Sequence, residues 1–176
     1  MKKRLVLIGT SHTYQYGAGN AWSSKAPCTP EAEQAFRKML TDIAVKHRVG
    51  GIAEEMNEDG LAEAEKLASV PQIIAGILGL PHIVCELNRQ ERVVLGIEQE
   101  NEIRISAFLN GKSEEDVEVA LKEQFLRRES VWLERVEALG TWPVLFICGA
   151  NHVPSFSALL RQRGVDCEVL DADWQA

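Results

Sequence analysis

The chain has 176 residues, of which 45% are hydrophobic and 26% are charged, with a formal net charge of −7. These values are typical of a globular protein, so we expect a single domain over residues 1–176. The acidic balance argues against a nucleic-acid partner, and no apolar run approaches the ~20 residues that cross a bilayer. The first apolar run is too short for a signal peptide and the four cysteines lack a C-x-x-C spacing, so we expect a cytoplasmic protein with reduced thiols.

Five apolar runs along the chain predict strands, and helical patterns separate most of them. Residues 5–8 are continuously apolar, which is typical of a strand buried on both faces of a parallel sheet. Further strands are predicted at 49–53, 82–87, 144–148 and 166–170, and helices at 29–47, 59–69, 72–79, 113–138 and 154–164. The order predicts an α/β fold, a three-layer sandwich whose central, mostly parallel sheet of about five strands has helices on both faces.

Two segments do not fit this alternation. Residues 13–24 are rich in Gly, Ser, Asn and aromatic side chains, which is typical of a loop, and we expect them to cover a binding site. Residues 93–112 mix apolar and acidic residues without a clear period, and no element is predicted there.

Two of the predicted strands end in the same motif, Gly-x-x-His. The first strand continues into Gly9-Thr10-Ser11-His12, and the strand at 144–148 continues into Gly149-Ala150-Asn151-His152. Ligands of open α/β sheets bind beyond the carboxyl ends of the strands. We therefore expect both histidines at a binding edge of the sheet.

Acidic residues follow two of the other strands. Glu54 and Glu55 come after the second strand, and Glu86 ends the third, where a solvated turn residue is the simpler interpretation. With His12 and His152, these acids allow two mechanisms. One divalent metal ion, held by His12, Glu54 and His152, could activate water. Alternatively, one histidine could act as a general base while the other stabilises the oxyanion; which of Glu54 and Glu55 faces the site stays open.

Arg128 is the arginine most suited to such a site. It lies on an otherwise apolar stripe of the helix predicted at 113–138, with no acid at ion-pairing spacing, which favours an inward role over a solvated one. Its neighbour Glu129 is expected to point elsewhere. Arg92, after the third strand, is a weaker candidate for the same role.

Taken together, these motifs resemble the superfamily that contains the erythromycin esterases, the ChaN-type haem-binding lipoproteins and the TraB/Tiki proteins. The resemblance lies in the two Gly-x-x-His motifs, the acids after the second strand and the pair Arg128-Glu129. It implies that His12 and His152 are the active-site histidines, that Glu54 or Glu55 is the carboxylate, and that Arg128 orients or pairs with an anion. The helical insertions of the larger relatives are absent, so their substrates do not transfer.

The sequence therefore predicts a small hydrolase that activates water against a small-molecule substrate, an ester, lactone, amide or peptide. Its expected site residues are His12, Glu54, Glu55, Arg128 and His152. A non-catalytic protein that binds a metal, a small molecule or haem is the alternative, although the polar segment 13–24 does not suit haem. A decayed site in a chain that acts through protein contacts is a third hypothesis. No membrane partner is expected, and Trp132, Trp142 and Trp174 leave a homodimer open if they are exposed.

Overall fold

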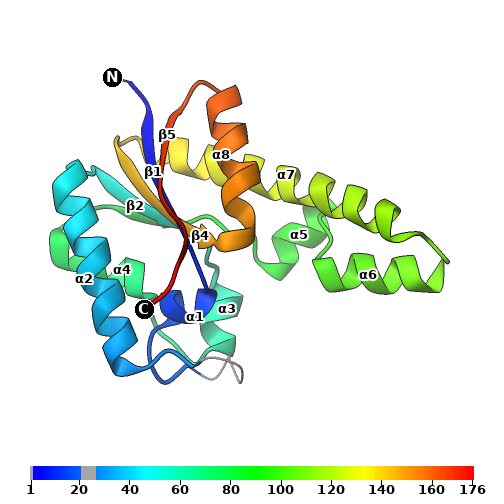
Figure 1. The fold of residues 1–176 in the computed structure, drawn as a ribbon, viewed down its shortest axis with the longest axis horizontal. Coiled ribbons are helices and arrows are strands. Elements are labelled where there is room, and N and C mark those ends of the chain that lie inside the picture. The colour runs from blue at the N-terminus through cyan, green and yellow to red at the C-terminus, as the bar shows by residue number, and fades with distance from the viewer. Residues whose placement is uncertain (1, 21–26) are drawn as a thin grey trace.

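The computed structural model describes residues 2–20 and 27–176, and its centre is a five-stranded sheet (Figure 1). All strand pairs are parallel, and the order is β3-β2-β4-β1-β5. The strands are β1 (Arg4–Thr10), β2 (Gly51–Glu54), β3 (His82–Val84), β4 (Val144–Gly149) and β5 (Asp166–Trp174). With helices around this sheet, the predicted α/β sandwich is confirmed.

Helices pack on both faces of the sheet because successive strand side chains point to opposite sides. Helices α2 (Pro30–His47) and α4 (Val70–Leu78) cover the face that carries Val6, Ile8, Ile52, Leu145 and Ile147. Helices α7 (Glu114–Ala138) and α8 (Val153–Gln162) cover the face that carries Leu5, Leu7, Ala53, Val144, Phe146 and Cys148. Each interior strand is therefore buried on both faces, which explains its uninterrupted apolar sequence.

The shorter elements differ from the predictions. The helix expected at 59–69 is only α3 (Glu58–Glu63), because the backbone at Glu65 is left-handed, with a φ of 56°. Ser69 then caps the next helix, and its Oγ accepts the N–H of Gln72 at 3.1 Å. The loop expected at 13–24 begins as a short helix, α1 (His12–Tyr16), and its residues 21–24 lie outside the described part.

The segment without a prediction contains two helices, α5 (Arg89–Leu95) and α6 (Glu100–Leu109). In Figure 1, α6 and the first half of α7 project away from the sheet. They share a small core of Ile103, Ala107 and Val117 that is separate from the two cores on the sheet. Helix α5 buries no side chain and is held to α7 by Arg127, whose Nη1 donates to the Gly96 carbonyl at 2.8 Å. The apolar contacts between α6 and the first half of α7 are therefore separate from the cores on the sheet.

The cysteines, three of the tryptophans and the apolar character of the helices bear on the remaining expectations. All four cysteines are unpaired, as predicted. Trp132 is fully buried, and Trp142 and Trp174 are half-buried, so these three tryptophans do not provide the exposed surface on which the homodimer hypothesis depended. Across residues 2–20 and 27–176, no helix combines the length and the apolar character that a membrane span requires.

Three neighbouring strands deliver the Gly-x-x-His and acidic segments to one place. Because β2, β4 and β1 are adjacent, Thr10 lies beside Gly149, and Glu54 lies beside Ile147. The chain leaves β1 into α1, leaves β2 at Glu55, and leaves β4 into the 3₁₀ turn η1 (Ala150–His152). Segments more than 90 residues apart in sequence therefore meet at the carboxyl edge of the sheet.

Candidate active site

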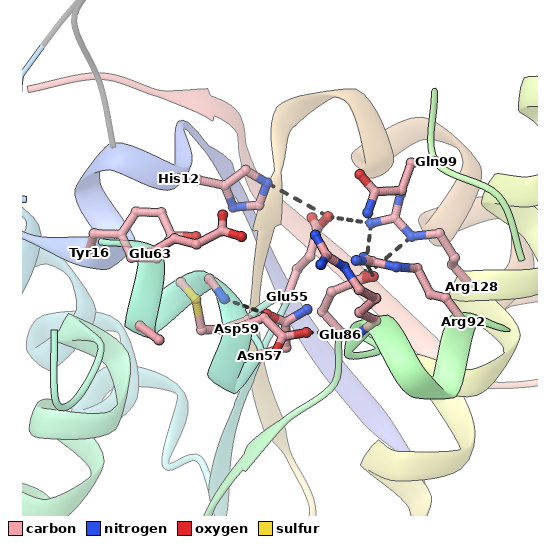
Figure 2. Close-up of a pocket in the computed structure, with 14 residues that line it drawn as sticks. His12, Tyr16, Glu55, Asn57, Asp59, Glu63, Glu86, Arg92, Gln99 and Arg128 are labelled. Carbon is pink, nitrogen blue, oxygen red and sulfur yellow. Dashed lines mark hydrogen bonds and ion pairs between the residues drawn. The ribbon is translucent and has the colours of Figure 1, made fainter. Parts of the chain in front are cut away.

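The carboxylate of Glu55 is the centre of the polar groups at this edge (Figure 2). Its Oε1 lies 3.7 Å from Nε2 of His12 and 3.5 Å from Nε2 of His152. The same oxygen accepts a hydrogen bond from Nη2 of Arg128 at 3.0 Å. Its Oε2 accepts the backbone N–H of Gly149 at 2.7 Å. One nearly buried carboxylate thus joins groups from α1, α7 and both Gly-x-x-His motifs.

Glu54 and Glu55 point to opposite sides, as consecutive residues at a strand end do. Glu55 faces α7, on the side of Ala53. Glu54 faces α4, on the side of Ile52, where the Ser69 hydroxyl donates to its Oε1 and Nε2 of His82 lies 2.8 Å from that oxygen. The site carboxylate is therefore Glu55, and Glu54 does not join the two histidines.

His152 is held by a carboxylate that the sequence interpretation placed elsewhere. Its Nδ1 lies 2.8 Å from Oε1 of Glu129, which also accepts the hydroxyl of Ser155 at 2.5 Å. Glu129 is fully buried. The ring centroids of Phe125 and Trp132 lie 4.1 Å and 4.8 Å from the centroid of the His152 ring. A carboxylate on Nδ1 directs the other ring nitrogen, Nε2, toward Glu55.

His12 is oriented in the same way by a neutral partner. Its Nδ1 lies 2.7 Å from Oε1 of Gln15, three residues further along α1, and its Nε2 faces Glu55. The side chain of His12 is 31% exposed, whereas that of His152 is 6% exposed. Of the two imidazoles, His12 is the one that solvent reaches.

Arg128 points inward and joins two carboxylates. Its Nη2 donates to Glu55 at 3.0 Å and to Oε2 of Glu86 at 2.8 Å, and Nε1 of Trp132 donates to the same Glu86 oxygen at 3.0 Å. The interpretation of Glu86 as a solvated turn residue is wrong, because the residue is buried by α7. Arg92 also lies near it, with Nη1 3.5 Å from Oε1 of Glu86.

These neighbours decide the charge state of the centre. Burial alone would raise the pKa of Glu55, but the charges of His12, His152 and Arg128 and the Gly149 N–H outweigh it and hold the pKa below its ordinary 4.5. Burial likewise lowers the pKa of Arg128, but Glu86 and Glu55 raise it above the ordinary value. The centre is thus an ionised carboxylate beside a permanent cation.

The lowered pKa of Glu55 predicts a specific dependence of stability on pH. A carboxylate whose pKa is depressed in the folded state stabilises the fold above its unfolded pKa, and this contribution disappears as the pH falls through the folded value. Thermal melting curves should therefore show a loss of stability in wild type below about pH 4.5. In Glu55→Gln this loss should be smaller. If the melting temperature fell equally with pH in both proteins, the lowered pKa of Glu55 would be contradicted.

Two clefts meet at this centre, and His12, Glu55 and Arg128 line both of them. The first cleft has a volume of about 460 Å³, with Tyr16 and Glu63 on the His12 side and Arg92 and Gln99 on the opposite side (Figure 2). The second, of about 570 Å³, contains His152 and Gly149. Burial and the charge of Glu63 raise the pKa of Tyr16 to about 12, so its phenol remains protonated and can act as a donor in the first cleft.

The residues do not fit the predicted metal site of His12, Glu54 and His152. Glu54 lies on the other side of β2, and in the described part of the chain no group of three His, Cys, Asp or Glu side chains is arranged to hold a metal ion. The Glu55 oxygen that faces both histidines is already paired with Arg128. A metal ion there would be repelled by the guanidinium.

The chain matches no protein family, no curated protein and no solved structure.

Sequence reasoning missed two site residues, and one of them left a signal. Glu129 lies on the same helical stripe as Phe125 and Trp132, four residues after the first and three before the second. An acid within an apolar stripe points to a buried partner. Gln15 left no such signal, because its contact with His12 needs the helix α1, in a segment whose composition is typical of a loop.

Proposed function

We propose that the protein is a hydrolase of a small ester, lactone, amide or peptide, which uses side chains and no metal to activate water. The observation that carries the proposal is the Glu55 carboxylate between two histidines and an arginine, at the junction of two clefts. We also propose that the chain belongs to the superfamily of the erythromycin esterases, the ChaN-type proteins and the TraB/Tiki proteins. It is supported by the closeness of the two Gly-x-x-His motifs, a carboxylate and Arg128.

The roles follow from exposure and hydrogen bonding. His12 is the general base, because solvent reaches it and its Nδ1 is occupied by Gln15. Arg128 stabilises the oxyanion: its Nη1 makes no hydrogen bond to any residue within 2–20 and 27–176, although the other guanidinium nitrogens are paired. His152 is the second group facing the oxyanion, and the carboxylates of Glu129 and Glu55 flank its ring.

The reaction then needs two steps. Nε2 of His12 takes a proton from water while the water oxygen bonds to the carbonyl carbon, and the carbonyl electron pair moves to the oxygen that Arg128 faces. When the C=O bond forms again, the bond to the leaving group breaks. The leaving oxygen or nitrogen receives the proton from His12, which returns the base to its initial state.

Turnover of a substrate panel by wild type, His12→Ala and His152→Ala tests this proposal. The panel contains chromogenic acetate and butyrate esters, a γ-lactone and a dipeptide, each measured with and without EDTA. We expect wild type to hydrolyse at least one of them in both conditions. The two variants should lose about 10²–10⁴-fold in kcat/KM because a general base or an oxyanion donor is missing.

His47→Gln is the matched control, since His47 lies at the end of α2, with Nδ1 3.1 Å from Arg4, outside both clefts. It should retain wild-type turnover. Full activity in His12→Ala, or loss of activity in EDTA, would contradict the mechanism. Saturable binding without turnover would replace the hydrolase with a ligand-binding protein.

A further inference from the structure

A second buried polar group lies behind His12, on the other side of β2 from the Glu55 centre. Gln15, Glu54 and Ser69 are each 0% exposed, and His82 is largely buried beside them. They come from α1, β2, the start of α4 and β3. Such a buried group is costly unless its hydrogen bonds are made. Gln15 links it to the site, because its side chain contacts both Glu54 and His12.

The hydrogen bonds fix the direction of the Gln15 amide. Its Nε2 lies 3.1 Å from Oε2 of Glu54 and 3.4 Å from the backbone carbonyl of Glu55, and both of these oxygens are acceptors. The amide NH₂ must therefore face them. Its carbonyl Oε1, which can only accept, then faces Nδ1 of His12 at 2.7 Å.

This direction decides which ring nitrogen of His12 carries the proton. Because Nδ1 faces an acceptor, it must be the N–H nitrogen, and in the neutral ring the lone pair is on Nε2, toward Glu55. If the amide turned over, its NH₂ would face Nδ1, and the proton would move to Nε2. That tautomer cannot take a proton at the position where the clefts meet.

We propose that Gln15 and Glu54 are positioning residues that hold His12 in the Nδ1–H tautomer, with the basic nitrogen directed into the site. Glu54 acts on His12 only through the Gln15 amide, and Ser69 and His82 hold the Glu54 carboxylate in place. The catalytic consequence rests on the proposed hydrolase function, whereas the tautomer itself does not.

Three variants separate positioning from mere packing. Gln15→Met retains the length of the side chain but removes both the donor and the acceptor. Gln15→Glu retains a carboxylate oxygen that faces Nδ1 of His12. The second oxygen of the new carboxylate shares a proton with Glu54, which replaces the hydrogen bond from the amide N–H. Glu54→Leu removes the acceptor that orients the amide. Removing a group that orients a catalytic side chain typically costs about 10–100-fold in activity.

The direct readout is the long-range ¹H–¹⁵N correlation spectrum of the full chain with ¹⁵N-labelled histidine, recorded at a pH where the imidazoles are neutral. His12 is assigned from its absence in His12→Gln. We expect a protonated Nδ1 in wild type and Gln15→Glu, and a mixture or the opposite tautomer in Gln15→Met and Glu54→Leu. A protonated Nε2 in wild type would overturn the proposal without depending on the folding of any variant.

Kinetics complete the test and keep the two proposals distinguishable. On any ester that wild type hydrolyses, Gln15→Met should lower kcat with little change in KM, and Gln15→Glu should recover most of it. An unchanged tautomer in Gln15→Met would contradict the inference. If the tautomers are as expected but no substrate is hydrolysed, the proposed hydrolase function is contradicted and the positioning of His12 still holds.

Discussion

Replacing Glu55 by Gln should strongly reduce turnover and destabilise the protein. The substitution retains the shape of the side chain but removes the negative charge that faces His12, His152 and Arg128. Removing one partner of a buried ion pair typically costs about 3–5 kcal/mol, because the remaining charge is left without its counter-charge. We expect a loss in the free energy of unfolding near that range in urea at neutral pH, and a fall in kcat/KM of about 10²-fold or more.

Glu123→Gln provides the matched control on α7, since Glu123 is exposed and lies outside both clefts. Its free energy of unfolding should remain within about 0.5 kcal/mol of wild type. If Glu55→Gln behaved like this control in both measurements, Glu55 could not be the centre of the site.

The two glycines of the Gly-x-x-His motifs should respond differently to alanine. A Cβ on Gly9 would overlap the carbonyl oxygen of Ala172 in β5 and lie 2.5 Å from Cγ2 of Val153. Since the first of these is backbone, β1 and β5 would have to separate. We expect Gly9→Ala to cost about 3 kcal/mol or more in unfolding free energy, measured as a fall in melting temperature of roughly 6–12 °C.

A Cβ on Gly149 would instead meet the site itself. It would lie 3.1 Å from Nε2 of His12 and 3.3 Å from Oε2 of Glu55, which are side-chain atoms that can move by a few tenths of an ångström. Gly149→Ala should therefore fold with a melting temperature near that of wild type, while its kcat/KM falls by about 10²-fold through the displaced base.

Gly76→Ala is the control for both glycine variants. Gly76 lies within α4, and a Cβ there would meet nothing within 4 Å. Alanine should stabilise the helix by up to about 1 kcal/mol and leave turnover unchanged. A stable, fully active Gly149→Ala would show that this glycine is not needed for space between the two histidine motifs.

The interior of the sheet was predictable because its central strands are buried on both faces. Residues 5–8 and 144–148 are apolar without interruption, and both lie in central strands. The helices on the sheet were predictable for the same reason, since each buries a regular apolar stripe. Residues 93–112 were not predictable: α5 buries no side chain and α6 buries only Ile103 and Ala107, so burial leaves too few apolar positions to mark a period.

The site was predictable in outline, because adjacent parallel strands bring their carboxyl ends together. That rule places His12, His152 and the Glu54–Glu55 pair at one edge but does not say which glutamate faces inward. The choice depends on the register of β2 in the sheet, since a shift of one residue exchanges the two sides. Glu86 enters the site through packing between elements, and Gln15 through the short helix α1 in a segment of loop-like composition, so neither contact is encoded in a local pattern. Glu129 alone left a signal, as an acid within an apolar helical stripe.

The separate core beneath α6 has a consequence for how this protein could change over time. The groups assigned to the chemistry stand at the edge of the sheet or on the half of α7 that packs on it, whereas Gln99 directly precedes α6, which rests on the small cluster of Ile103, Ala107 and Val117. Substitutions in that cluster can move one wall of the first cleft without moving the catalytic groups. New substrates could therefore be acquired on the projecting helices while the reaction is inherited unchanged from the sheet.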